Sequence, residues 1–297
     1  MATDQHPGWS AVTHPRPGEA GSPLLVASTD GRRRPGDRTF IVVQGIRSWI
    51  EPFEMQRFAL IAERLRARLV IVETPGFGTP GSRLLAPERR ALRQGDFGPV
   101  AARMFTAART ALEEGDAAAA PVSFLGYSLG ASIAAAMACA AAEQGWPVSE
   151  VVLVEPVALH RWRALHLLAA SWREDRRLDD YLSCNEDIPH VVAPWDRRPG
   201  TRPPNERRRD LLALALALRH GRLYTDLLAT PARRLVIIRG DRSALSTAAG
   251  DPPLADLQRR GIPVAEMSIP GHHALWHSLP AVDALARTLR KVLDSPR

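Results

Sequence analysis

The chain has 297 residues, 45% of them hydrophobic, which is enough to bury the core of a single α/β domain. It carries 39 basic against 32 acidic residues, but the arginines are spread out without interleaved aromatic residues, so no nucleic-acid partner is expected. The 2 cysteines provide no disulfide framework. No apolar stretch reaches the length of a membrane span, and the polar N-terminus lacks a signal-peptide core. We therefore expect a cytoplasmic protein that does not bind a membrane.

The chain begins with a stretch that has no regular pattern. Residues 1–21 are polar, with several Pro and Gly residues and no apolar periodicity, which predicts a flexible N-terminal arm. A short strand is expected at 23–28. From Thr39 onward, runs of apolar, mostly β-branched residues alternate with segments of helical spacing. These predicted strands lie at 39–43, 69–72, 122–127, 151–154, 235–238 and 264–269.

This alternation predicts the fold class. Fully apolar strands alternating with helices indicate an α/β fold, with a mostly parallel central sheet and helices on both faces. In such sheets the ligand site lies at the carboxyl ends of the strands. Residues 157–230 break the alternation and are mainly helical in pattern, so they predict a helical cap inserted over that site. The core then consists of residues 22–156 and 231–297.

The segment Gly126-Tyr127-Ser128-Leu129-Gly130 is the most informative motif. It follows an apolar strand pattern and precedes an alanine-rich helix pattern, which is the context that a nucleophile elbow requires. The two glycines leave room for the turn, and Ser128 would stand at its tip. The N–H of Leu129 would point at an oxygen that gains negative charge during acyl transfer.

The chain resembles the α/β-hydrolase fold family, and within it the serine esterases and thioesterases, from about Pro23 onward. The resemblance rests on Gly126 to Gly130, on the order of elements, and on a histidine-bearing tail after the last strand. It implies that His273, in Gly271-His272-His273, is the base, with His272 and His277 as alternatives. It also implies a second oxyanion N–H at Ile46.

The resemblance leaves the catalytic acid open. The family usually carries it in the loop after the strand 235–238, at a position that Ala244 occupies here. Asp241 lies in the same loop, and Glu155 ends the preceding strand, where some members place their acid. We keep Asp241, Glu155 and the absence of an acid as alternatives.

Two further positions depart from the family pattern. Gln44-Gly45 stands where many members have His-Gly. This change keeps the oxyanion N–H, which belongs to the main chain, but alters the side chain that supports it. Glu73 stands where an aspartate is commoner before Pro-Gly-Phe-Gly, and this change is expected to affect loop anchoring only.

The implied function is a serine hydrolase that cleaves a carboxylic ester or thioester through an acyl-enzyme on Ser128. The arginines of the predicted cap favour an acidic small-molecule or carrier-bound acyl substrate, and Gln44, Tyr127 and Trp162 are expected to contact it. We expect no cofactor, and no metal, because a zinc site at His273 and His277 lacks further ligands. The alternatives are an acyltransferase, a hydrolase of carbon–carbon bonds, and a non-catalytic ligand receptor on the same fold.

Overall fold

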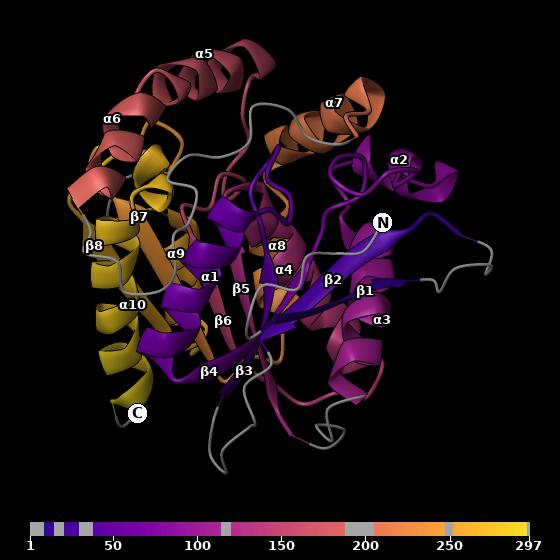
Figure 1. Cartoon of the computed structure of the whole chain (residues 1–297), viewed down its shortest axis with the longest axis horizontal. Coiled ribbons are helices and arrows are strands. Elements are labelled where there is room, and N and C mark those ends of the chain that lie inside the picture. Colours follow the sequence, from indigo (N-terminus) through magenta and orange to yellow (C-terminus); the bar gives the residue numbers. More distant parts are fainter. Residues whose placement is uncertain are drawn as a thin grey trace.

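The computed structural model describes residues 9–14, 21–29, 38–113, 120–187, 205–246 and 252–295. These residues form an eight-stranded sheet of order β1-β2-β4-β3-β5-β6-β7-β8 (Figure 1). The strands are β1 (Trp9–His14), β2 (Leu24–Thr29), β3 (Arg38–Val43), β4 (Ala67–Val72), β5 (Val122–Tyr127), β6 (Val148–Val154), β7 (Arg234–Gly240) and β8 (Val264–Ile269).

The pairing of the strands brings the loops that follow the parallel strands to one edge of the sheet. Strands β3 to β8 pair in parallel, whereas β1 and β2 run antiparallel to their neighbours. Val43 is in register with Gly126, and Val154 with both Tyr127 and Ile238. The segments that follow β3, β5, β6, β7 and β8 therefore meet at the carboxyl-terminal edge.

Helices cover both faces of this sheet. Helices α1 (Pro52–Leu65) and α10 (Leu279–Asp294) pack together on one face, and α3 (Gly98–Glu113) and α4 (Leu129–Glu143) pack on the other (Figure 1). Along β3, Phe40 and Val42 belong to the first of these two cores, and Ile41 and Val43 to the second. Because both faces of the central strands are buried, they read as continuous apolar runs in the sequence. The predicted fold class is confirmed.

The N-terminal region differs from the expected arm, because Trp9–His14 forms strand β1. It pairs along its whole length with β2, and Ser10 Oγ lies 2.8 Å from Ser28 Oγ. The Trp9 side chain is 7% exposed and joins the core beneath α1. Burial of the Trp9 indole at the sheet edge stabilises this otherwise polar segment as a strand. Residues 1–8 and 15–20 lie outside the described part of the chain.

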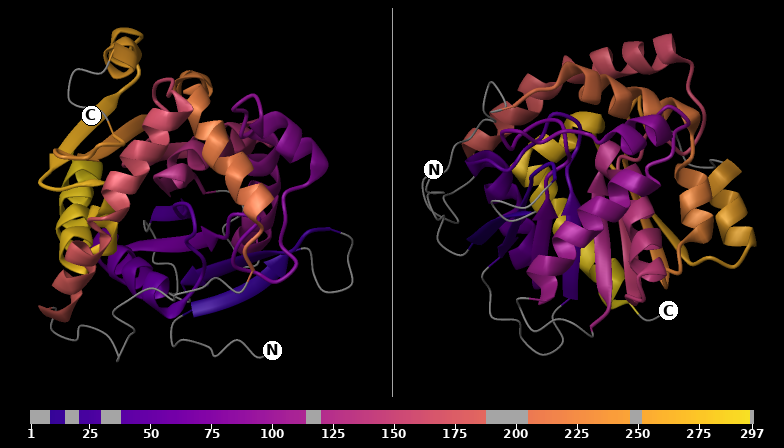
Figure 2. Two further views of the ribbon diagram at one scale, coloured as in Figure 1. Left: turned by 90° about the horizontal axis from the view of Figure 1, so that it is seen from above. Right: turned by 90° about the vertical axis from the view of Figure 1, so that its right-hand side faces the viewer.

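Residues 157–230 divide into two parts. Helices α5 (Ala164–Asp175), α6 (Leu178–Ser183) and α7 (Arg208–Ala217), here called the upper helices, lie above the carboxyl-terminal edge of the sheet (Figure 2). Helix α8 (Leu223–Ala229) instead packs against α4 and belongs to the layer that covers the sheet. Residues 188–204 of the predicted cap lie outside the described residues.

The remaining helices complete the outer layers. Helix α2 (Ala86–Leu92) contacts both α3 and α7, and α9 (Pro252–Arg259) lies beside β8. The described residues also form three short 3-10 helices: η1 (Cys184–Asp187), η2 (Leu218–His220) and η3 (His273–His277). Within the described ranges, no helix is both long and apolar enough to cross a bilayer.

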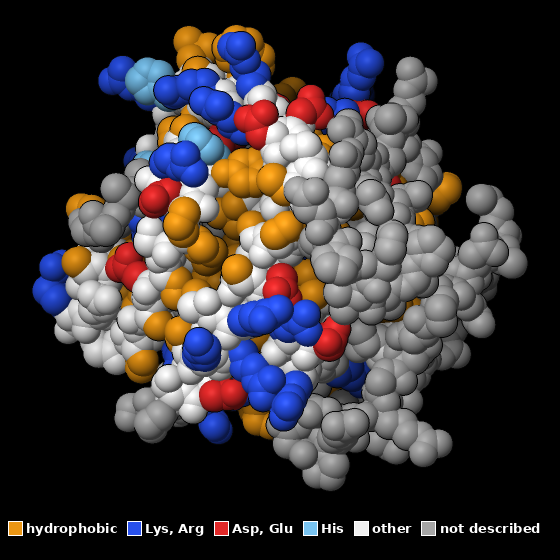
Figure 3. Space-filling view, turned by 60° about the vertical axis from the view of Figure 1, so that its left-hand side comes forward, with side chains coloured by type: hydrophobic (Ala, Val, Ile, Leu, Met, Phe, Trp, Pro, Cys, Tyr) orange, Lys and Arg blue, Asp and Glu red, His pale blue; other side chains and the backbone are white. Residues whose placement is uncertain are grey.

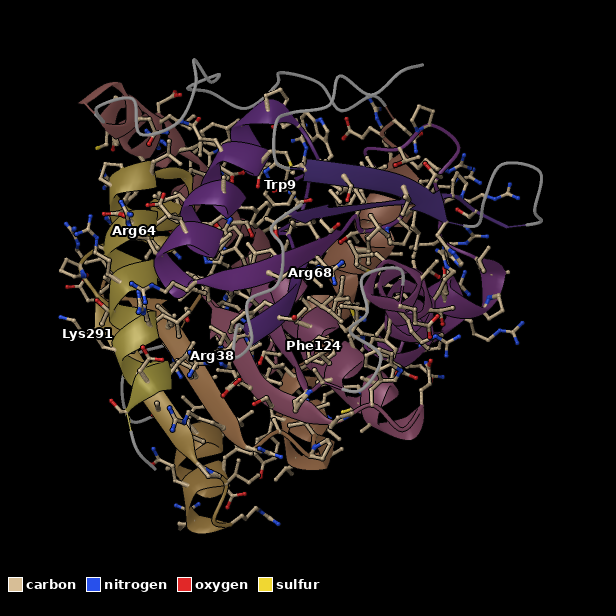
Figure 4. The ribbon with its side chains drawn as sticks, turned by 60° about the horizontal axis from the view of Figure 1, so that its bottom comes forward. Trp9, Arg38, Arg64, Arg68, Phe124 and Lys291 are labelled. Atoms are coloured by element: carbon tan, nitrogen blue, oxygen red, sulfur yellow. The ribbon has the colours of Figure 1, made fainter. Side chains whose placement is uncertain are left out.

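A charged concavity of about 1040 Å³ lies between the C-terminal ends of α1 and α10. Arg64 and Lys291 beside it mark the end of the molecule that faces away from the upper helices (Figure 4). Its arginines are opposed by carboxylates, as in the pair Arg64–Asp283 at 2.5 Å, and basic and acidic side chains are interspersed on this side of the molecule (Figure 3). Paired, solvated charges of this kind contribute little to stability, and they lie far from the strand ends where the sheet would bind a ligand.

Candidate active site

The predicted elbow has the backbone geometry of a strained turn. Ser128 joins β5 to α4 with φ 56° and ψ −116°, a region that residues other than glycine rarely adopt. A Cβ at Gly126 would collide with the carbonyl of Gly130, and one at Gly130 would collide with that of Val43. Both glycines are therefore required for the turn to close against the sheet.

Three side chains from separate segments form one buried hydrogen-bonded row at this turn. His273 Nε2 lies 2.8 Å from Ser128 Oγ, and His273 Nδ1 lies 3.0 Å from Glu155 Oε2. The exposed fraction is 7% for Ser128 and His273 and 0% for Glu155. Their elements, β5, β6 and the η3 turn after β8, meet only because the parallel register aligns the strand ends.

Glu155 is held in place by its own backbone and by β7. It lies directly after β6 with φ 53°, and its N–H continues the sheet by donating to the Ile238 carbonyl at 2.7 Å. Its second carboxylate oxygen, Oε1, accepts from the N–H of Gly240. One oxygen is thus fixed by the sheet while the other faces His273, an arrangement that selects the ring tautomer with hydrogen on Nδ1.

Asp241, the other candidate acid, lies elsewhere. Its carboxylate accepts from the N–H of Gly271 at 2.8 Å, lies 3.5 Å from Arg242 Nε, and is 50% exposed. It braces the start of the loop that leads to His273 and makes no contact with the imidazole among the described interactions. The structure therefore brings Glu155, and not Asp241, to the histidine.

Of the alternative bases, neither has a hydrogen bond to Ser128 among the contacts of the described residues. The main-chain N–H of His272 donates to Tyr181 Oη at 2.6 Å, and His277 Nδ1 lies 3.3 Å from Arg57 Nη2. Burial, followed by the positive charge of Arg57, holds the pKa of His277 well below its ordinary value. His277 is therefore neutral at neutral pH and accepts the arginine N–H.

Tyr127 supports the backbone of His273. Its hydroxyl donates to the His273 carbonyl at 3.0 Å, and its ring stacks on Trp276 at 5.1 Å between centroids and 13° between planes. Burial, and then the negative charge of Glu155, raises the pKa of Tyr127 well above its ordinary value, so the hydroxyl keeps its proton. The Tyr127 side chain is only 4% exposed, so its hydroxyl stabilises the folded structure through this hydrogen bond.

Replacing Tyr127 by Phe is expected to lower the free energy of unfolding by about 1–2 kcal/mol. The substitution leaves the His273 carbonyl buried without its donor, while the ring packing on Trp276 is retained. Urea unfolding followed by circular dichroism measures the change. An unchanged midpoint would contradict the assigned role of the hydroxyl.

Two main-chain donors flank Ser128. Leu129 begins the 15-residue helix α4, and Ile46 follows β3 beside Gly45, where an added Cβ would lie 3.6 Å from Ser128 Cβ. Neither of these N–H groups has a hydrogen-bond acceptor among the described residues. The helix N-terminus adds a partial positive charge at this point. The N–H of Leu129 therefore lies at the positive end of α4, next to Ser128.

The side chains predicted to contact substrate are engaged within the protein. Gln44 Nε2 donates to Glu54 Oε2 at 3.2 Å, and Trp162 Nε1 donates to the Val157 carbonyl at 2.8 Å. Tyr127 binds the histidine loop as described above. The structure therefore gives all three side chains supporting contacts.

A buried ion pair beneath the site was not anticipated from the sequence. The Arg57 guanidinium is 0% exposed, and its Nη1 donates to both carboxylate oxygens of Glu54, at 2.8 and 2.6 Å. It lies over the rings of Phe53 and Trp276, at 4.9 and 5.3 Å from their centroids. Through Gln44 and His277 the pair connects the loop after β3 with the turn that bears His273. The spacing Glu54–Arg57, one helical turn within an apolar face, was the available signal.

Glu73 anchors loops, as the sequence predicts. Its carboxylate accepts from the N–H of Ile50 at 3.0 Å and of Thr79 at 2.9 Å. Burial raises its pKa, which these hydrogen bonds partly offset. Gly78, with φ 90°, has no room for a Cβ beside this carboxylate.

The donor set does not suit a metal ion. Within the described residues, no group of three or more His, Cys, Asp or Glu side chains converges as a ligand set. His273 and His277, which are four apart in the sequence, are directed to different partners.

Comparison with known proteins identifies the architecture. No family model and no curated protein matches the chain. Among solved structures, a thermostable carboxyl esterase from Bacillus coagulans is similar with a TM-score of 0.60 at 12% identity, over 97% of this chain and 98% of that one. The thioesterase domain from the curacin biosynthetic pathway is similar with a TM-score of 0.55 at 15% identity, over 96% and 99%. A peroxisomal α/β-hydrolase from Saccharomyces cerevisiae gives 0.57 at 14% identity, over 97% and 90%.

At these identities the similarity concerns the fold. It extends over nearly the whole length of each protein, and it agrees with the strand order, the layers and the elbow described above. The chain therefore has the α/β-hydrolase fold.

Proposed function

We propose that the protein is a serine hydrolase that cleaves a carboxylic ester or thioester. The observation that carries the proposal is the row from Ser128 Oγ to His273 Nε2 at 2.8 Å and from His273 Nδ1 to Glu155 at 3.0 Å. Serine is too weakly acidic to attack a carbonyl unaided, so it needs a positioned base, and the base needs a fixed tautomer. The esterases and thioesterases among the similar structures support the same class of reaction.

In the proposed mechanism, Ser128 Oγ attacks the carbonyl carbon while His273 Nε2 takes the hydroxyl proton. The carbonyl oxygen becomes an oxyanion, which accepts hydrogen bonds from the N–H groups of Leu129 and Ile46. His273 then donates its proton to the departing alcohol or thiol, and the acyl group remains on Ser128. Water attacks this acyl-enzyme with His273 again as the base, which releases the acid and restores the serine.

Glu155 would act by holding and stabilising the imidazole. Its carboxylate keeps hydrogen on Nδ1, so Nε2 is free to accept the serine proton, and it stabilises the positive charge that the ring then carries. Burial at 0% exposure strengthens this interaction, because less solvent screens it.

We further propose that the upper helices form a cap over the site. Helix α5 contacts the segment that bears the proposed base, because Glu174 accepts from the main-chain N–H of His273 at 2.9 Å, and this contact supports a cap at the site. Exposed arginines on and beside α5 favour an acidic or carrier-bound acyl substrate; they are Arg161, Arg163, Arg173, Arg176 and Arg177.

Covalent labelling tests the proposed function. A fluorophosphonate should form a single adduct, mapped by mass spectrometry to Ser128, and hydrolysis of a p-nitrophenyl ester should be lost in parallel. Ser128→Ala should not be labelled. Ser132→Ala is the matched control, because Ser132 lies one turn further along α4, is 0% exposed, and should leave labelling intact. Folded wild-type protein that takes up no label would refute the proposal.

A further inference from the structure

Glu174 is a buried carboxylate that lies outside the row of Ser128, His273 and Glu155. It belongs to α5, most of whose residues face solvent, including Leu165, Leu168 and Trp172 at 62–78% exposure. The buried residues of α5 are Leu167, Ala170 and Glu174, and Glu174 is 3% exposed. A carboxylate at such a position is costly to bury unless it is fully hydrogen-bonded.

Both oxygens of this carboxylate bind main-chain N–H groups of loops that reach the candidate site. Oε1 accepts from Ala244 at 2.5 Å, in the loop after β7, and Oε2 accepts from His273 at 2.9 Å. Ala244 stands where the family usually carries its acid. Glu174 therefore joins that loop to the histidine through backbone contacts.

These two hydrogen bonds have to offset an unfavourable electrostatic environment. Among the ion pairs between described residues, none involves Glu174. The residue also lies in the last turn of α5, where the helix dipole disfavours negative charge. Glutamine would avoid both penalties, so the charge of Glu174 is better explained by a role in holding the two loops.

We infer that Glu174 is a positioning residue, which holds the backbone of His273 in its reactive place only while α5 is seated on the core. The inference rests on the proposed function. The other polar contacts of His273 come from core residues: Tyr127 to its carbonyl, and Ser128 and Glu155 to its ring. Glu174 alone among these partners belongs to the upper helices.

This arrangement couples substrate entry to the assembly of the site. As part of the proposed cap, α5 is expected to move when a substrate enters, and its Glu174 binds the main-chain N–H of His273. Movement of α5 withdraws the acceptor from the His273 N–H, and its return restores that acceptor. The base is then fully supported only after the substrate has been enclosed.

Glu174→Gln tests this role, because it keeps the shape of the side chain but turns one acceptor into a donor. The amide nitrogen then faces a main-chain N–H, and one of the two loops loses its anchor. The kcat for a p-nitrophenyl ester is expected to fall about 10- to 100-fold, the effect of a small displacement of a reacting group. The KM should change less than about twofold. The rate of fluorophosphonate labelling should fall by the same factor as kcat.

Two matched variants of α5 separate positioning from other effects. Leu167→Ala removes a buried side chain, 8% exposed, and controls for lost stability. Asp175→Asn removes the neighbouring charge, which also interacts with His273, and controls for electrostatics alone. Asp175→Asn should keep kcat within about threefold. If Asp175→Asn lowers kcat as much as Glu174→Gln does, the positioning role is overturned.

Hydrogen exchange keeps the inference distinct from the proposed function. One of the two amides, Ala244 or His273, should exchange faster in Glu174→Gln than in Leu167→Ala, because only the first variant turns one of their two acceptor atoms into a donor. Wild-type protein that takes up no label overturns the proposed function, whatever the exchange shows. Unchanged exchange at these two amides overturns the role of Glu174, whatever the labelling shows.

Discussion

Replacing Glu155 by Gln is expected to lower kcat/KM for an activated ester by a factor on the order of 10⁴. The glutamine oxygen would keep the N–H of Gly240 as its partner, so the amide nitrogen would face His273 Nδ1. The imidazole would then carry its hydrogen on Nε2 and could not accept the Ser128 proton. Steady-state kinetics with a p-nitrophenyl ester measures the loss, and circular dichroism checks the fold.

Asp241→Asn is the matched control for the choice of acid. Asparagine keeps an oxygen acceptor for the N–H of Gly271, and Asp241 does not contact the imidazole, so activity should stay within about threefold. A loss at Asp241 equal to that at Glu155 would contradict the assignment made from the hydrogen bonds.

Replacing Arg57 by Met should have the largest effect on stability, a loss of about 3–5 kcal/mol in the free energy of unfolding. The substitution leaves the Glu54 carboxylate, 2% exposed, without its cation, and leaves His277 Nδ1 without a donor. Urea unfolding followed by tryptophan fluorescence measures the change. Removing both charges in Glu54→Gln/Arg57→Met should recover at least half of the loss, since an uncharged pair has no buried ion to desolvate.

Arg64→Met provides the comparison on the same helix. Arg64 also forms ion pairs, with Asp283 at 2.5 Å and Glu63 at 2.7 Å, but its side chain is 23% exposed. Its removal should cost less than about 1 kcal/mol, because water screens such pairs. Equal losses at Arg57 and Arg64 would show that burial does not decide the energy of these pairs.

The sequence predicted the sheet and the elbow because local signals agreed there. The strands from β3 to β7 are buried on both faces, so their apolar runs are unambiguous. The small residues Gly126 and Gly130 and the apolar helix after Ser128 identify the turn. Strand β1 was missed because it has few apolar residues, and its order depends on pairing with β2 and on burial of Trp9.

The acid could not be chosen from the sequence for a geometric reason. Glu155 and Asp241 follow neighbouring parallel strands, so both were placed at the same edge. What separates them is the backbone at Glu155, whose φ of 53° orients the carboxylate toward His273. No residue pattern predicts this left-handed conformation, because a glutamate rarely adopts it.

The side-chain roles of Gln44, Tyr127 and Trp162 depended on tertiary contacts as well. Gln44 and Tyr127 lie near the strand ends and Trp162 lies in the predicted cap, which suggested contact with substrate, and each donates its hydrogen bond within the protein. Likewise, the position of α8 between two strands placed it in the predicted cap, and its packing against α4 is a tertiary contact that the sequence does not reveal. Periodicity identifies a helix and not the layer that it joins.

The hydrogen bond from Ala244 to Glu174 uses only the main chain of residue 244. With Glu155 next to the imidazole, the loop after β7 has no need of an ionisable side chain at that point. Selection at residue 244 would then act on size and backbone shape, and it would leave the chemical character of the side chain free to drift. Under the proposed function, the carboxylates that bind the histidine and this loop follow β6 and lie on α5, so a search for relatives that demands an acid after β7 would pass over proteins built in this way.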